Sequence, residues 1–569
     1  MTRDRMTRVN AQTARVRFKN VQGLVLLGSL LALVLVFTNV LPLLRLLQRA
    51  VSPEALSWLV SSSLAHTALW NSLQVSSTVA LFATVLALAL VLLLEKTNLP
   101  GRKVLKLLLF VPLVVPPQIL TIAWLNWAGP VGHLQQLVKR FLDSNTPLWN
   151  LYSQGGIILL LVVFTLPVAY LTLAPGLSRI PKSLEEAAGL DGASLTDVWL
   201  RILFPLLLPG VLAAFVLAFL AALGNFGIQA LLGIPAQFVT LPTLIYQRVA
   251  SFASGGFDHA AALTLVLSLP ALLALSVQYL VLKRRDTQLE TLLEPPLRYE
   301  LGIWRWVGAV TLWLLVAGVV TLGPFVSMVL TALTKAYGLP PTFSNLTLTH
   351  FAFVLGELDS FRRALANSFM LALVAALVTA TLALLIGYVL LKLHGRFALP
   401  LQLFIDLPYA LPGLVFALAL ILVWLRSPVP LYGTLSLLLL AYVGHYLAFA
   451  LQSVSAAWRQ LDKGLEEASR VDGASLFARM RFVFLPLLLP SLVAAALLVF
   501  LNAFTELSLS ALLAGSRSET LGWLVFGLEQ AGSSNQAAAV STVLVLVLAV
   551  LALVLTSVQR IIQVSRQTP

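Results

Sequence analysis

The sequence predicts an all-α, polytopic membrane protein made of two related halves, and three observations lead to that prediction. Hydrophobic residues make up 59% of the chain and charged residues 11%, against about 45–50% and about 25% in soluble domains. Apolar runs long enough to cross a bilayer as helices, about 20 residues each, recur along the whole chain. One polar segment occurs twice, with every equivalent pair of positions 281 residues apart.

Twelve apolar segments are predicted to cross the membrane, six in each half. They lie at 21–44, 70–94, 104–128, 155–176, 205–224, 260–282, 305–331, 366–391, 400–425, 431–452, 486–505 and 537–559. Six spans per half leave both halves in the same orientation, which predicts a parallel repeat about an axis along the membrane normal. The basic start of the chain is also typical of a signal peptide. The first apolar run is too long for one and no small-residue cleavage site follows it, so we interpret it as a retained span.

Lysine and arginine concentrate in the segments that would face the cytoplasm if both termini lie there. The positive-inside rule therefore predicts two cytoplasmic termini. The same distribution accounts for the net charge of +14 without a nucleic-acid partner, because basic loops beside a bilayer meet anionic lipid headgroups.

The duplication extends beyond the polar segment. Asn71 has a counterpart in Asn367, 296 positions later, and the prolines at 112 and 116 recur at 408 and 412. The fall in this offset from 296 to 281 places extra residues in the first half, near 129–154. We therefore expect a cytoplasmic N-terminus at 1–20, a first repeat at 21–283 containing the polar segment 184–209, a cytoplasmic linker at 284–304, a second repeat at 305–559 containing the polar segment 465–490, and a cytoplasmic C-terminus at 560–569.

The first copy of the polar segment reads LEEAAGLDGASLTDVWLRILFPLLLP, and the second reads LEEASRVDGASLFARMRFVFLPLLLP. In the first copy, Ser183 and Glu186 have the capping-box spacing that begins a short helix. Gly192 ends that helix, because glycine tolerates a left-handed turn. Ser194 is placed to cap a second helix, which leads through prolines into an apolar run. The pattern predicts a helix, a glycine turn and a second helix at the mouth of a span.

The spacing of glutamate, small residues, glycine and proline in both copies resembles the EAA loop of ABC importer permeases. The resemblance implies a type I permease fold in which the loop is a coupling helix that docks into a groove on a cytoplasmic ATPase. The ATPase-coupling residues it implies are Glu185, Glu186, Ala187, Ala188, Gly192, Glu466, Glu467, Ala468, Ser469 and Gly473. A chain with two such loops resembles the fused permeases of the iron(III), thiamine and aminoethylphosphonate group. The alternative is an interfacial amphipathic helix that recurs by duplication and binds nothing.

By the same resemblance, the expected partners are a homodimeric cytoplasmic ABC ATPase and a periplasmic or extracellular solute-binding protein, and the expected location is the bacterial cytoplasmic (inner) membrane. The sequence has no phosphate-binding loop of the form G-x-x-x-x-G-K-[ST], so ATP hydrolysis is expected on a separate chain. There is no cysteine, and the six histidines show no ligand spacing. We therefore expect a transport subunit without a cofactor rather than an enzyme, and no metal ligand is assigned.

Polar residues at membrane depth are costly and indicate a translocation pathway. The candidates are Asn225, Gln229, Glu506 and Ser508, which follow the fifth and eleventh spans at equivalent places. Glu506 corresponds to Asn225, and its carboxylate would attract a cation; an ordinary interface residue is the alternative. We expect His445 to form an interhelical hydrogen bond and the prolines of the third and ninth spans to kink their helices.

The favoured hypothesis is the permease of a binding-protein-dependent ABC importer, with iron(III) before thiamine or 2-aminoethylphosphonate as substrate. The alternative class is a secondary transporter with parallel repeats. It would need proton or sodium relays inside the membrane, and the spans hold few acidic residues. A membrane-embedded enzyme is the least favoured class, because no catalytic constellation is visible.

Overall fold

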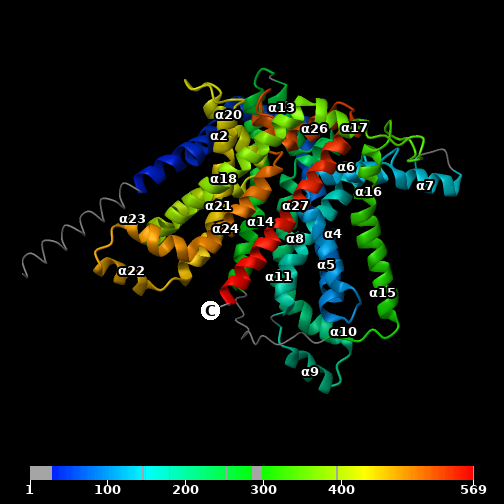
Figure 1. The fold of residues 1–569 in the computed structure, drawn as a ribbon, viewed down its shortest axis with the longest axis horizontal. Coiled ribbons are helices and arrows are strands. Elements are labelled where there is room, and N and C mark those ends of the chain that lie inside the picture. The colour runs from blue at the N-terminus through cyan, green and yellow to red at the C-terminus, as the bar shows by residue number, and fades with distance from the viewer. Residues whose placement is uncertain are drawn as a thin grey trace, which may run out of the picture. The chain divides into compact units, whose positions relative to one another are not determined.

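The computed structural model describes residues 28–143, 147, 149–178, 180–251, 253–284, 298–392 and 395–567. The expected cytoplasmic N-terminus (1–20), the beginning of the first expected span and most of the expected linker (285–297) lie outside the described residues. The described chain is built of helices (Figure 1). Its extended pairings are two isolated bridges, which join Thr97 to Tyr299 and Thr334 to Leu346.

Within the described residues, ten helical stretches are long and apolar enough to cross a membrane. They are Gly28–Ala50, Ser63–Lys96, Gln154–Leu177, Val198–Gly224, Gly256–Leu280, Trp304–Ala332, Asp359–Lys392, Leu435–Gln460, Leu476–Phe504 and Ser534–Leu551. Each corresponds to one expected span, and several extend past the expected ends. The prediction of an all-α polytopic membrane protein is confirmed.

The third and ninth expected spans, 104–128 and 400–425, each consist of two helices joined at a sharp bend, in the spans where the prolines predicted kinks. In the first half, α5 (Arg102–Val114) is followed after a short break by α6 (Pro117–Ala128), and the stretch Pro117–Leu142 that begins with α6 is bent by 110° from α5. In the second half, α19 (Gly395–Ala410) and α20 (Gly413–Trp424) are bent by 108°. Pro116 and Pro412 stand at the two breaks in extended conformation. Proline removes a backbone donor and keeps the preceding residue out of the helical region, so the chain turns instead of kinking slightly.

The described residues form two compact units, and each unit draws on both halves of the sequence. In the unit of residues 58–247, 263–362 and 522–569, the bundle core is α4 (Ser63–Lys96), α8 (Gln154–Ser178) and α11 (Phe204–Gly224). Against α6 of this unit pack α16 (Gly323–Ala332) and α27 (Ser534–Gln567), which come from the second half of the sequence.

The other unit, 1–57, 248–262 and 363–521, shows the reciprocal exchange. Its core pairs α21 (Leu435–Gln460) with α24 (Leu485–Phe504), and α2 (Leu41–Ala50) from the start of the chain packs on α20. The first helix of each sequence half therefore packs on helices of the other half.

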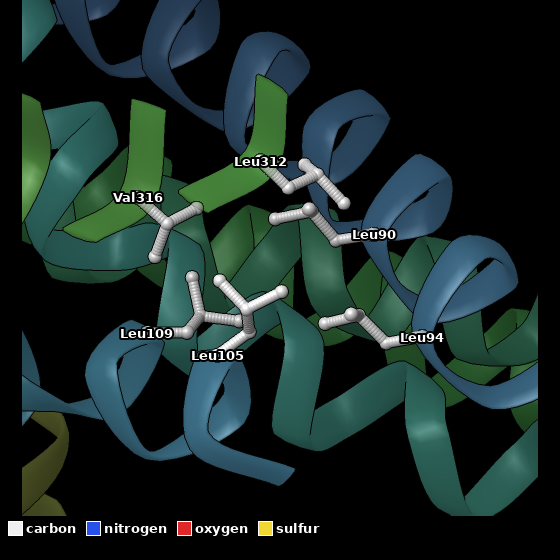
Figure 2. A pocket seen from close by; sticks show the side chains of 6 residues that line it. All are labelled: Leu90, Leu94, Leu105, Leu109, Leu312 and Val316. Atoms are coloured by element: carbon white, nitrogen blue, oxygen red, sulfur yellow. The ribbon is translucent and has the colours of Figure 1, made fainter. Parts of the chain in front are cut away.

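The first helix of the second sequence half, which we call the exchanged helix, is held in the unit of α4 by an apolar contact and by a hydrogen bond from the Thr321 hydroxyl to the carbonyl of Leu108 at 3.3 Å. The helix α15 (Trp304–Leu312) continues as the π-helical segment η3 (Trp313–Leu322). Figure 2 shows the side chains that meet there, Leu312 and Val316 from this helix, Leu90 and Leu94 from α4, and Leu105 and Leu109 from α5. They leave no space large enough for a water molecule. Close van der Waals packing of this kind holds membrane helices together, because lipid supplies little hydrophobic driving force.

Candidate coupling loops and pathway residues

Both polar segments fold as a helix, a glycine turn and a second helix, as the sequence predicts. The first contains α9 (Lys182–Leu190), then α10 (Leu195–Asp197), which continues through the π-helical segment η2 (Val198–Leu203) into α11 (Figure 1). The second contains α22 (Lys463–Val471), α23 (Leu476–Arg479) and the π-helical segment η5 (Met480–Phe484). We call them the first and second coupling loops.

The turns are set by Gly192 and Gly473, whose φ angles are +77° and +76°. The residue after each glycine donates its backbone N–H to a carbonyl near the end of the preceding helix, Ala193 to Ala188 at 2.9 Å and Ala474 to Ser469 at 3.0 Å. This is the glycine-terminated helix end in which the left-handed residue closes the last turn.

One detail of the first loop was predicted wrongly. The helix begins at Lys182, so Ser183 lies inside it and its side chain does not cap it; the residue at the cap is Pro181. The expected caps of the second helices are present. Ser194 accepts from the backbone N–H of Asp197 at 3.2 Å, and its equivalent in the second copy, Ser475, caps α23 in the same way.

The first glutamate of the first coupling loop points into the protein. Glu185 is 3% exposed and forms an ion pair with Lys96 at the end of α4, in which both side chains are fully buried. Tyr299 donates its hydroxyl to the other carboxylate oxygen of Glu185 at 2.7 Å. Burial and the neighbouring Glu185 both raise the pKa of Tyr299, so the hydroxyl keeps its proton and remains a donor.

The second coupling loop is anchored by the equivalent glutamate with a larger set of cations. Glu466 lies 2.5 Å from Lys392 at the end of α18 (Asp359–Lys392), 2.8 Å from Arg470 and 3.7 Å from the buried Arg479. Tyr388 also donates its hydroxyl to Glu466, at 3.1 Å. Burial alone would raise the pKa of Glu466, but the hydrogen bond and charge of Lys392, with the charge of Arg470, hold it below its ordinary value.

The two lysine anchors are equivalent and were missed as site residues at the sequence level. Lys96 and Lys392 are 296 positions apart, the offset that relates Asn71 to Asn367, and Glu185 and Glu466 are 281 apart. A lysine at the shared offset was the available signal. The repeat is not exact, because Arg479 has Val198 as its counterpart.

The other predicted coupling residues divide into exposed and covered positions. Exposed residues are Glu186, Ala187, Gly192, Glu467, Ala468 and Gly473. Ala188 is half-buried, and Ser469 is buried with its hydroxyl donating to the carbonyl of Glu466. Each helix ends in an apolar side chain that stands in the open, Leu190 at 90% and Val471 at 87% exposure. Each loop therefore presents one exposed glutamate and one apolar tip, which are features of an interaction surface.

Three of the four predicted pathway residues, Asn225, Gln229 and Glu506, form side-chain hydrogen bonds to the nearby backbone. Asn225 accepts from the backbone N–H of Ile228 at 3.0 Å, at the start of α12 (Gly227–Gly233). Glu506 does the same at the start of α25 (Ser510–Leu513), where its carboxylate accepts from Leu509 at 2.6 Å and Ser510 at 3.0 Å. The asparagine and the glutamate are thus equivalent caps.

Gln229 donates to the carbonyl of Ala222 at 2.7 Å, and its own side-chain oxygen is buried with no hydrogen-bond partner among the described residues. Ser508 is half-buried and lies close to Gly413. His445 contacts the carbonyl oxygen of Pro408 through Nδ1 at 2.9 Å, which is the interhelical hydrogen bond that the sequence predicted. Within the described residues no group of three or more histidines and carboxylates is arranged to hold a metal ion.

Comparison with known proteins identifies the family. The model of the family described as "Binding-protein-dependent transport system inner membrane component" matches residues 86–287 and 379–566, and each match contains one coupling loop. The chain is 26% identical to a putative ferric transport system permease protein FbpB of Haemophilus influenzae, over 80% of this chain and 72% of that protein. It is also 26% identical to a ferric transport system permease protein FbpB of Actinobacillus pleuropneumoniae, over 84% and 69%. A shorter relative is the molybdenum transport system permease protein ModB of Escherichia coli, 29% identical over 36% of this chain and 88% of that protein. The chain therefore belongs to the family of binding-protein-dependent transport system inner membrane components and carries two copies of its domain.

Proposed function

We propose that this chain is the permease of an ATP-driven importer of iron(III), supplied by a solute-binding protein on the outer side. The observation that carries the importer class is the duplicated loop geometry: each loop is fixed to the end of an equivalent helix by a glutamate–lysine ion pair and presents an exposed glutamate and an apolar tip. Two equivalent loops suit an ATPase of two equivalent subunits. The names of the two ferric relatives support iron(III), with thiamine and 2-aminoethylphosphonate as the alternative substrates.

In the proposed cycle, a separate homodimeric ATPase binds and hydrolyses ATP and moves the two coupling loops. The ion pairs pass that movement into the membrane. Lys96 ends α4 and Lys392 ends α18, and both helices are 34 residues long. A loop displaced by the ATPase therefore pulls on a rigid element that crosses the bilayer.

Reconstitution tests this function. Proteoliposomes that contain the chain, its ATPase and its binding protein should take up iron(III) when ATP is supplied on the ATPase side, and should take up none when the ATPase is left out. Uptake driven by a proton or sodium gradient without any ATPase would instead support a secondary transporter. Uptake of thiamine or 2-aminoethylphosphonate in preference to iron(III) would correct the substrate and leave the importer class in place.

The proposed topology makes a prediction of its own. A peptide tag at either terminus should be protected from protease added outside spheroplasts and cleaved once the membrane is opened, because the positive-inside rule places both ends in the cytoplasm. A tag in an outer segment such as 133–142 serves as the accessible control. Cleavage of one terminal tag from outside would mean that the number of spans is odd.

Glu506 offers a test of the substrate charge. Glu506→Gln keeps a side-chain oxygen for capping α25 but removes the negative charge, so we expect iron(III) uptake to fall several-fold while the ATPase still binds. Asn225, which already caps α12 without charge, shows that an amide can fill this position. Uptake should be measured with the wild type and the variant at equal protein. Equal uptake would confine Glu506 to its capping role.

A further inference from the structure

A groove of about 490 Å³ runs along the exchanged helix in the unit of α4. Its walls are Pro100 and Gly101 before α5 and, on α15 and η3, Trp306, Val310, Trp313 and Leu314. Three of these side chains are more than half exposed, Trp306 at 56%, Val310 at 57% and Leu314 at 65%. The groove is therefore an apolar surface open to whatever surrounds the helix.

The length of the groove matches one leaflet of a bilayer. It extends along the helix from Trp306 to Gly318, roughly 15–18 Å at about 1.5 Å rise per residue. Half of a hydrocarbon core of about 30 Å is about 15 Å. An acyl chain that entered beside Trp306 would reach the middle of the membrane near Gly318.

Three basic residues adjoin, in the chain, the lining residues Gly101 and Trp306 at one end of the groove, which we call its entrance. Arg102 and Lys103 follow Gly101, and Arg305 precedes Trp306, with its guanidinium carbon 5.5 Å from the centre of the tryptophan ring. Of the neighbouring lysines, Lys96 forms an ion pair with Glu185 and Lys106 forms one with Glu95. In the part of the chain that the structure describes, none of the three entrance residues forms an ion pair. Glu300, an acidic residue five positions before Arg305, has an exposed side chain.

We propose that this groove binds an anionic phospholipid from the leaflet on the side of the coupling loops. One acyl chain lies between the two tryptophans, and the phosphate lies at the entrance against Arg102, Lys103 and Arg305. The charge complementarity selects an anionic headgroup, and tryptophans at the level of the headgroups are typical of a membrane interface.

The lipid site has a structural connection to the first coupling loop. The chain that leads into α15 pairs with the end of α4 through Thr97 and Tyr299, and Tyr299 also donates to Glu185. A lipid that holds α15 against the start of α5 therefore also stabilises the position of Tyr299, which donates to Glu185 of the first coupling loop. Binding of the lipid should raise the thermal stability of the chain even when no ATPase is present.

The experiment compares lipids with the purified full-length chain in detergent. We expect phosphatidylglycerol to raise Tm and to remain bound in native mass spectrometry, and phosphatidylcholine with the same acyl chains to do neither. Glycerol phosphate, which has the charge without the acyl chains, should also have no effect. Stabilisation by glycerol phosphate would replace the lipid site with a simple anion site, and equal stabilisation by both phospholipids would overturn the proposal.

Two kinds of variant locate the site. Lys103→Gln with Arg305→Gln removes charge at the entrance, and Gly318→Leu fills the groove, since a side chain at Gly318 meets open space. Each should weaken phosphatidylglycerol binding about tenfold without changing Tm in the absence of lipid. The matched controls are Lys139→Gln on the separate helix α7 (His133–Leu142) and Val326→Leu on the exposed side of α16. Unchanged binding in the test variants, or an equal loss in the controls, would contradict the assignment.

Discussion

Lys96→Met should abolish most ATP-driven uptake and lower the yield of folded protein. The substitution leaves the carboxylate of Glu185 fully buried without its cation, and removal of one partner of a buried ion pair costs about 3–5 kcal/mol. The hydroxyl of Tyr299 alone does not replace a positive charge. We expect at least a tenfold loss of uptake at equal total protein, together with a clear fall in Tm. Uptake in proteoliposomes and thermal unfolding in detergent measure the two effects.

Three further variants separate the anchor from general damage. Lys96→Met with Glu185→Met replaces both charges by apolar side chains and should restore folding and most uptake. Lys106→Met removes a lysine whose pair with Glu95 is about one quarter exposed, so its effect should be small. Lys392→Met should be milder than Lys96→Met, because Arg470 and Arg479 still face Glu466. Wild-type uptake and Tm in Lys96→Met would show that the buried pair does not hold the loop.

Gly192→Val and Gly473→Val should uncouple ATP use from transport while membrane insertion stays intact. Both glycines have φ near +77°, where a side chain costs about 1–2 kcal/mol, and a β-branched residue is worse than most. Among the described residues, no atom beyond the chain neighbours lies within 4 Å of a Cβ at either position, so the effect comes from the backbone and not from a steric clash. The strained turn would change the direction of the loop helix and displace the tip at Leu190 or Val471.

We expect uptake to fall about tenfold in each valine variant, with normal amounts of protein in the membrane. Gly192→Asn and Gly473→Asn are the matched controls, because asparagine tolerates the left-handed conformation better than other residues with a side chain. The measurements are uptake by the reconstituted importer and its ATPase rate with binding protein present. Full ATP-driven uptake in both valine variants would remove the turns from the coupling mechanism.

The local sequence predicts the position of the bends after Val114 and Ala410 but not their angles. The prolines of the third and ninth spans predicted an interruption in each, and the interruptions are present at equivalent places in both halves. Proline dictates only that the helix cannot continue with its normal hydrogen bonds. The angles of 110° and 108° depend on what α6 and α20 pack against, and α16 and α2 come from the opposite sequence halves.

The sequence by itself determined the features that depend on neighbouring residues. Apolar runs set the number and place of the membrane helices, and glycine with its flanking helix formers set the two coupling loops, because hydropathy and backbone preference act locally. Only the tertiary structure decided which glutamate of each loop points inward. The partners of Glu185 are 89 and 114 positions away in the chain, and a buried carboxylate points to wherever the fold supplies a cation and a donor. The same reason explains why Lys96 and Lys392 looked like ordinary cytoplasmic charges before the helices that carry them were placed beside the loops.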